Sequence, residues 1–284
     1  MSIINQFKTA MLLALMTGLL LWIGSLWGQG GLTVAIIFSL GINVVSYFYG
    51  HKMVLRMYKA QEIHESDHPN LWNMVKEVAH ASHIPMPKVY IVPSPQANAF
   101  ATGPNPKKAS IAVNQGLLDL LDEDELKGVI AHEAAHIKNR DILISTVAAT
   151  IAGVISYIAF MARWGALFGG FGRDRDGGNM LELLVLAILT PLLATIIQLA
   201  ISRSREFVAD ATAAKNLKDG KGLSSALHKI SGSVEQHPYR PSSKTETTAH
   251  MMISNPFRGK GLFKLFSTHP ETKERMRKLE NMKF

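Results

Sequence analysis

The sequence predicts an α+β membrane protein with four transmembrane helices and a cytosolic domain made of a small sheet and several helices. Three observations support this prediction. Two pairs of long uncharged runs interrupt a chain that otherwise carries charges throughout. Short strand patterns bounded by proline lie between the two pairs. Amphipathic helical patterns with charges at both ends flank the second pair, and such helices are too polar to cross a bilayer.

The first pair of runs lies at the N-terminus, where no Lys, Arg, Asp or Glu occurs over residues 9–51. We expect helices over 10–27 and 32–50, joined by a glycine-rich turn at 28–31. Each run approaches the roughly 20 residues that cross a bilayer core. A cleaved signal peptide is the alternative, but only Lys8 precedes the first run and no small-x-small cleavage site precedes the second.

The second pair of runs lies between Asp141 and Arg163 and between Glu182 and Arg203. Each run is about twenty residues long, which again suits a transmembrane helix. A buried helical hairpin in a soluble protein is the competing interpretation. The glycine and proline within these runs favour membrane spans, where both residues are more frequent than in soluble helices.

Basic residues mark the cytoplasmic ends of membrane spans. Lys52, Arg56 and Lys59 follow the second run, whereas the turn at 28–31 is uncharged. The loop over 163–182 departs from this rule, because its three arginines are only partly offset by two aspartates. On balance we expect both termini in the cytoplasm. The chain then divides into a hairpin over 1–51, one half of the soluble domain over 52–141, a hairpin over 142–202 and the other half over 203–284.

The overall charge and the absence of cysteine restrict the chemistry. The formal net charge is +8, which suits contact with anionic lipid, and there is no cysteine to form a disulfide or a thiolate ligand. Nucleic acid is not an expected partner, because no stripe of Lys and Arg alternates with aromatic residues. The oligomeric state is not predicted.

Capping patterns locate two helices of the soluble domain. Asp67 and Pro69 suit the start of a helix over 67–82, and Asp122 with Glu125 forms a capping box at the start of another. Hydrophobic periodicity and turn residues predict the remaining elements. These are a strand within PMPKVYIVPSP, extended pieces in NAFATG and ASIAVNQGLL, a helix over SRSREFVADATAAKNL, an irregular loop over 235–261 and a charged helix within HPETKERMRKLENM.

The helix that begins at Asp122 contains the sequence HEAAH, which places His132 and His136 four residues apart. This spacing brings both imidazoles onto one helix face, where their nitrogens can bind one zinc ion. Glu133 would lie beside the open coordination position and take a proton from water. The helix is too polar for an intramembrane protease motif. Asn139 and Ile142 replace the Gly and His of metzincins.

A downstream glutamate would complete a thermolysin-like set of ligands. Because His136 lies just before a predicted span, a ligand beyond the second pair must return to the same side, and two crossings satisfy this condition. Glu206 follows the fourth run on a predicted helix, and Asp210 lies one turn further on. Asp210 would either hydrogen-bond a ligand histidine or be a solvated carboxylate. The downstream candidates are Glu182, Glu206, Glu235, Glu246, Glu271, Glu274 and Glu280.

These motifs resemble those of the HtpX-type membrane zinc endopeptidases, relatives of the CAAX-prenyl and Oma-type proteases. The resemblance covers nearly the whole chain and rests on PKVYIVPSPQANAFATG, GLLDLLDEDELKGVIAHEAAHIKNRD, SRSREFVADATAA, MMISNP and STHPETKERMRKL. It implies a gluzincin-like zinc peptidase domain in which His132, His136 and Glu206 hold one Zn²⁺ and Glu133 is the catalytic base. It also implies a bacterial inner-membrane enzyme that cleaves misfolded membrane proteins at a cytosolic active site.

The same resemblance suggests roles for two further groups of residues. Asn98, Ala99 and Phe100 would belong to an edge strand that pairs with the substrate backbone, an ordinary core turn being the alternative. His269 would donate to the transition-state oxyanion, or else cap a helix or lie at the surface.

The predicted function is that of a membrane-bound zinc metalloendopeptidase. A membrane-anchored zinc protein that holds clients without cleaving them is the alternative, and structural zinc with four protein ligands would favour it. A transporter is disfavoured, because the predicted spans contain almost no ionisable residues.

Overall fold

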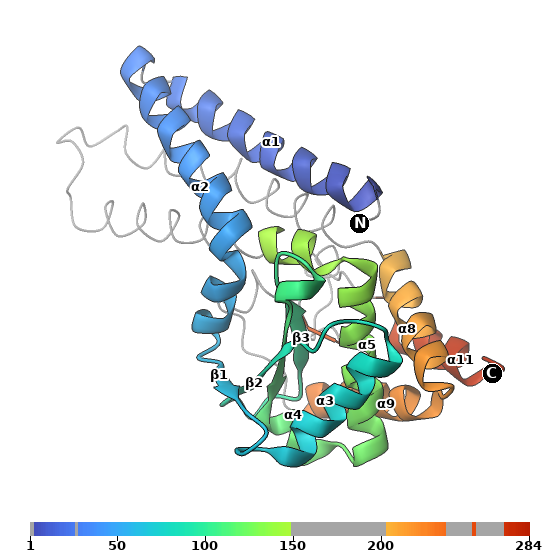
Figure 1. The fold of residues 1–284 in the computed structure, drawn as a ribbon. Coiled ribbons are helices and arrows are strands. Elements are labelled where there is room, and N and C mark those ends of the chain that lie inside the picture. Colours follow the sequence, from blue (N-terminus) through green and yellow to red (C-terminus); the bar gives the residue numbers. More distant parts are fainter. Residues whose placement is uncertain (1–2, 26–27, 149–202, 237–251, 254–269) are drawn as a thin grey trace.

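The computed structural model describes residues 3–25, 28–148, 203–236, 252–253 and 270–284 (Figure 1). Two long helices, α1 (Ile3–Ser25) and α2 (Gly28–Met57), lie side by side and extend away from the rest of these residues. The C-terminal end of α2 leads directly into a four-stranded sheet that is covered by helices.

Both N-terminal helices are longer than the sequence predicts. The predicted turn at 28–31 is wrong, because these residues form the first turn of α2. Among the described residues, α2 is the one helix that is long and apolar enough to cross a membrane, and α1 contains a shorter apolar stretch, Leu13–Trp22. The second predicted pair of spans lies outside the described residues, apart from a helical start at 142–148.

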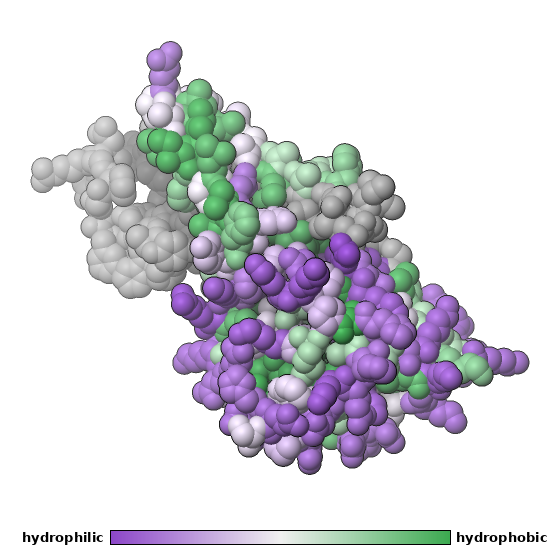
Figure 2. All heavy atoms as spheres, viewed as in Figure 1, coloured by the Kyte–Doolittle hydropathy of each residue, from purple (hydrophilic) through white to green (hydrophobic). Residues whose placement is uncertain are grey.

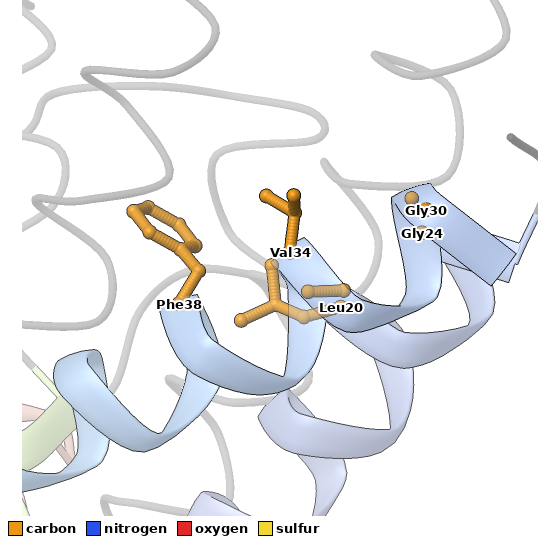
Figure 3. Close-up of a pocket in the computed structure, with 7 residues that line it drawn as sticks. Leu20, Gly24, Gly30, Val34 and Phe38 are labelled. Carbon is orange, nitrogen blue, oxygen red and sulfur yellow. The ribbon is translucent and has the colours of Figure 1, made fainter.

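Small residues allow α1 and α2 to pack closely. A Cβ atom added at Gly24 would collide with the side chain of Ala35, so the two backbones approach each other here. Beside this contact, side chains of both helices line an apolar pocket of about 390 Å³ (Figure 3). Large apolar side chains of α2 face outward, and Figure 2 shows them as an apolar arm above a hydrophilic domain. They include Val34, Ile37, Phe38, Leu40, Val44 and Phe48.

The sheet has the strand order β1 (Gln61–Ile63), β2 (Lys88–Val92), β4 (Ser110–Asn114) and β3 (Ala99–Thr102). Strands β2 and β4 are parallel, and the other two pairs are antiparallel. The strands predicted within PMPKVYIVPSP and NAFATG are confirmed as β2 and β3. The extended prediction for ASIAVNQGLL is right only to Asn114, because α4 (Gln115–Leu120) follows at once.

The two faces of the sheet contact different parts of the molecule. Side chains alternate between faces along a strand. Ala99 and Ala101 therefore join the main core with α5 (Glu123–Asn139), whereas Phe100 points to the rear face. There Phe100 packs against the last turns of α2, and its ring centroid lies 5.1 Å from that of Tyr58. The membrane-span candidate and the edge strand β3 are thus in direct contact.

Helix α5 lies at the centre of the part that contains the sheet. The predicted capping box is confirmed, because Asp122 accepts from the Glu125 N–H and Glu125 accepts from the Asp122 N–H. A Cβ at Gly128 would lie 2.6 Å from the backbone nitrogen of Leu223, so α5 and α9 cross almost in backbone contact. The helices packed with it are α3 (Pro69–Ala81), α8 (Arg203–Leu217), α9 (Lys221–Gln236) and, through α8 and α9, α11 (Thr272–Glu280).

Candidate metal centre

The two histidines of the HEAAH sequence lie on the buried face of α5. Their spacing of four residues places the imidazoles one turn apart, as the sequence predicts. The Nε2 atoms of His132 and His136 are 3.1 Å apart, and the two rings are nearly perpendicular. His132 is only 1% exposed, which leaves its ring no contact with bulk solvent.

Glu206, in the first turn of α8, brings a carboxylate to the same point. Its Oε1 lies 3.5 Å from Nε2 of His136, and its Oε2 lies 3.7 Å from Nε2 of His132. One ligand atom from each of the three residues lies within 4.8 Å of the others. Two helices that precede and follow residues 149–202 therefore supply one compact group.

The donor set and its spacing fit a zinc ion. In a tetrahedral site with metal–ligand distances of about 2.0–2.1 Å, neighbouring ligand atoms are about 3.3–3.4 Å apart. The two nitrogens are 3.1 Å apart, and each lies 3.5 or 3.7 Å from a different oxygen of the Glu206 carboxylate, which is close to that value. Two imidazole nitrogens and a carboxylate oxygen are also ligands that zinc prefers. Among the described residues, this is the one such group of three.

Each histidine has a carboxylate at its other ring nitrogen. Nδ1 of His132 lies 2.9 Å from Oδ1 of Asp210, and Nδ1 of His136 lies 3.2 Å from Oδ2 of Asp141. In the neutral ring, a carboxylate at this position holds the proton on Nδ1, so that Nε2 can bind a metal. Arg140 ends α5 in a left-handed conformation (φ 61°), which turns Asp141 back toward the helix.

Arg275 of α11 fixes the carboxylate behind His132. Its Nε donates to Oδ2 of Asp210 at 2.8 Å, and its Nη2 donates to Oδ1 at 2.7 Å. Nη1 donates to the backbone oxygen of Ile253 at 2.8 Å and lies 3.4 Å from Oε2 of Glu206. The guanidinium is 1% exposed, so this bidentate pair is fully desolvated.

The surroundings shift the protonation of the buried groups. Burial raises the pKa of Glu133 to about 7, although the His136 charge and a hydrogen bond from the Ala101 N–H oppose the shift. Burial also raises the pKa of Asp210, but the Arg275 charge outweighs it and brings the value to about 2. Glu133 is therefore poised to exchange a proton near neutral pH, whereas Asp210 stays ionised.

Strand β3 presents backbone groups beside Glu133. The Asn114 N–H donates to the Asn98 carbonyl, and hydrogen-bonded pairs alternate along an antiparallel ladder. The N–H and C=O groups of Ala99 and Ala101 therefore point away from β4, toward the outer edge of the sheet. No other described strand pairs with this edge. The hydrogen bond from the Ala101 N–H to Glu133 agrees with that direction.

The residues predicted for the substrate strand have different environments. Asn98 is buried, and its side-chain oxygen accepts from the Ile253 N–H, so it anchors a neighbouring segment. Ala99 contributes an outward-facing backbone, whereas the Phe100 side chain belongs to the rear face. His269 lies outside the described residues.

Sequence reasoning missed Ala101, Asp141 and Arg275. A signal existed for Arg275, because Leu279 lies one helical turn further on and shares its buried face. Asp141 carried a weaker signal as a lone acid immediately before an apolar run.

Comparison with known proteins identifies the family to which this centre belongs. The model of peptidase family M48 matches residues 65–283, which include all three clustered residues. The chain belongs to peptidase family M48. Two relatives of the chain are the protease HtpX homologues of Syntrophobacter fumaroxidans and Thermococcus kodakarensis. The first is 49% identical over 98% of this chain and 99% of the relative, and the second is 47% identical over 99% of this chain and 97% of the relative.

A solved structure has the same fold. Ste24p of S. mikatae superposes with a TM-score of 0.50 at 18% identity, and the match covers 97% of this M48 chain and 65% of the longer Ste24p chain. The predicted resemblance to HtpX-type proteases is confirmed, and the chain is a metalloprotease.

Proposed function

We propose that this M48 chain is a membrane-bound zinc endopeptidase that cleaves misfolded or damaged membrane proteins at the cytoplasmic face of the cytoplasmic membrane. One observation carries the proposal. Two imidazole nitrogens and a carboxylate oxygen converge beside Glu133 and beside the edge of β3, which no other described strand pairs with. The nitrogens and the carboxylate oxygen suit a metal ion, Glu133 suits proton transfer, and the strand edge suits pairing with an extended peptide.

His132, His136 and Glu206 would hold the zinc ion. A zinc ion there would polarise the scissile carbonyl and make a nearby water more acidic. The described residues supply three ligands, which is the number typical of catalytic rather than structural zinc. This number supports peptide hydrolysis over a purely structural metal in a client-holding module.

Glu133 would carry the proton through the reaction. Its buried carboxylate takes a proton from the water as the water oxygen bonds to the peptide carbon. It then gives that proton to the amide nitrogen as the carbon–nitrogen bond breaks. Burial raises the pKa of this carboxyl to about 7 in the metal-free site, which favours its taking a proton from water.

The outer edge of β3 would bind the substrate as an added strand. Ala99 directs an N–H and a C=O toward this edge and Ala101 directs a C=O, as pairing with an extended peptide requires, while the Ala101 N–H is donated to Glu133. Because the Ala101 N–H contacts Glu133, a peptide paired here lies next to the base. Strand addition recognises the backbone of the substrate rather than particular side chains, which suits a protease that acts on many unfolded sequences.

The chain would be a multi-pass membrane protein with both termini in the cytoplasm. We propose hairpins over 1–51 and 142–202, and one peptidase domain formed by 52–141 and 203–284. Two observations support this division: α2 has the length and exposed apolar surface of a span, and a single hydrophobic core joins residues from both halves. Halves that share a core must lie on the same side of the membrane.

The test compares purified full-length wild type with Glu133→Gln, each loaded with zinc, on an unfolded membrane-protein substrate. We expect the rate to fall about 10²–10⁴-fold while the bound zinc, measured by mass spectrometry, stays at one per chain. Glu206→Gln serves as the contrasting variant, because it should lose zinc as well. Full activity in Glu133→Gln would refute the assignment of the base.

A further inference from the structure

A second cavity lies on the rear face of the sheet, away from the metal centre. Its volume is about 450 Å³. Helix α2 contributes Phe48 and Lys52, strand β2 contributes Lys88, and the short helix η1 (Pro106–Lys108) contributes Lys107 and Lys108. Figure 2 shows hydrophilic side chains gathered where the apolar arm meets the larger domain.

The cavity has a surplus of positive charge. Of its four lysines, Lys88 is paired with Glu62 at 2.7 Å. Lys52, Lys107 and Lys108 form no ion pair with any residue that the structure describes, and all three are exposed. Three uncompensated ammonium groups around one cavity repel each other, so an anion bound among them would relieve that repulsion.

The other wall of the cavity is apolar. Phe48 lies one turn before Lys52 on α2 and continues the outward-facing apolar surface of that helix. Met86, 37% exposed, adds a second apolar side chain from the loop before β2. The cavity therefore combines anion-binding groups with hydrocarbon contacts, which is the chemistry of a lipid headgroup joined to acyl chains.

The position along α2 favours the same occupant. Lys52 is the first charged residue after Lys8, so it marks the level at which the apolar surface of α2 ends. If α2 spans the membrane as proposed above, this level is that of the phosphate groups of the cytoplasmic leaflet. A lysine at this depth attracts anionic lipid directly.

We propose that this cavity binds the phosphate-bearing headgroup of an anionic membrane phospholipid. The lipid phosphate lies among Lys52, Lys107 and Lys108, and its acyl chains run along Phe48 into the bilayer. Because the cavity is formed by α2, β2 and the turn before β4, the bound lipid connects the membrane span to the sheet. This inference rests on the proposed membrane-spanning role of α2 but not on catalysis.

The test measures lipid retained by detergent-purified full-length protein, using native mass spectrometry. Phosphatidylglycerol is compared with phosphatidylcholine of the same acyl chains, and inorganic phosphate is added as a soluble competitor. The variant carries Lys52→Gln, Lys107→Gln and Lys108→Gln. The matched control carries Lys215→Gln, Lys221→Gln and Lys273→Gln, three exposed lysines on α8, α9 and α11.

We expect wild type to prefer phosphatidylglycerol, and the cavity variant to lose about ten- to hundredfold in affinity, since each lysine near a membrane contributes about fivefold. The control should bind as wild type does. Equal binding by wild type and the cavity variant would overturn the proposal, as would an equal loss in the control. Release of the lipid by millimolar inorganic phosphate would instead make the site one for free anions.

Glu133→Gln separates this proposal from the proposed function. This variant should retain phosphatidylglycerol as wild type does, because the cavity lies on the opposite face of the sheet from α5. The cavity variant should in turn keep its peptidase activity in detergent, which also shows that it folds. A failure of lipid binding and a failure of proteolysis therefore give different patterns.

Discussion

The buried pair of Arg275 and Asp210 should have separable effects on stability and on metal binding. The pair is bidentate, with donor–acceptor distances of 2.8 and 2.7 Å, and its side chains are only 1% and 5% exposed. In Arg275→Met the Asp210 carboxylate stays buried without its main partner. Breaking a buried pair in this way costs about 3–5 kcal/mol. For a domain of this size, that cost corresponds to a fall of about 6–20 °C in Tm.

The double variant Asp210→Leu/Arg275→Met should behave differently. Removing both charges leaves no uncompensated carboxylate, so at least half of the lost stability should return. The His132 Nδ1 atom, however, loses the oxygen that lies 2.9 Å away. Loss of such a partner lowers metal affinity by about 10–100-fold. Arg275→Met alone keeps this oxygen and should bind zinc nearly as wild type does.

Two assays resolve the two effects. Thermal unfolding is followed on metal-free protein, because bound metal would stabilise each variant to a different extent. Zinc affinity is measured by competition with a chromophoric chelator. Wild-type stability in Arg275→Met would refute the claim that Arg275 compensates Asp210. Wild-type zinc affinity in the double variant would show that Asp210 does not orient His132.

Two further predictions concern pH and the sheet edge. Burial lowers the pKa of His136, but the hydrogen bond to Asp141 and the charge of Glu206 outweigh burial and raise the pKa to about 9. In metal-free protein, protonated His136 therefore stabilises the folded state fully below about pH 6.5, and this stabilisation is lost as the pH rises through 9. Zinc must displace that proton, so chelator competition should show affinity rising about tenfold per pH unit up to about pH 9; a flat profile would contradict this. Ala99→Pro removes an N–H from the outer edge and should lower kcat/KM in a peptide-cleavage assay while the β3–β4 ladder and the bound zinc are retained. Because Ala99 is fully buried, thermal unfolding is measured alongside, so that a loss of packing is distinguished from the loss of a substrate hydrogen bond. Unchanged kcat/KM would exclude strand addition at Ala99.

Local patterns predict the centre of the site well. The HEAAH spacing and the Asp122 capping box both lie within one helix, where neighbours three or four residues apart determine the geometry. Glu206 could be proposed because it lies just beyond an even number of predicted crossings. The pairing of Arg275 with Asp210 could not, because the two residues are 65 positions apart and only tertiary packing brings them together.

The errors have physical causes as well. The glycines at 28–31 suggested a turn, but small residues also allow two helices to approach, as Gly24 and Ala35 show. Strand β1 was missed because it has three residues, of which Ile63 alone is buried, so it has no periodicity to detect. The direction of the Ala101 N–H depends on the pairing of β3 with β4, which a single strand pattern does not contain.

If α2 spans the membrane as proposed, its contact with the sheet limits where a membrane substrate can be cut. Leu55 packs against the rear of the sheet with Phe100 and lies three residues beyond Lys52, where the apolar surface of α2 ends. Three helical residues span roughly 5 Å, so β3 is held about one helical turn from the proposed membrane surface. A peptide paired with β3 must be extended, whereas a substrate segment inside the bilayer must keep its backbone hydrogen bonds internal. Cleavage is therefore expected in segments that have left the bilayer by a few residues, and a helical span must first unfold or be withdrawn before it can reach Glu133.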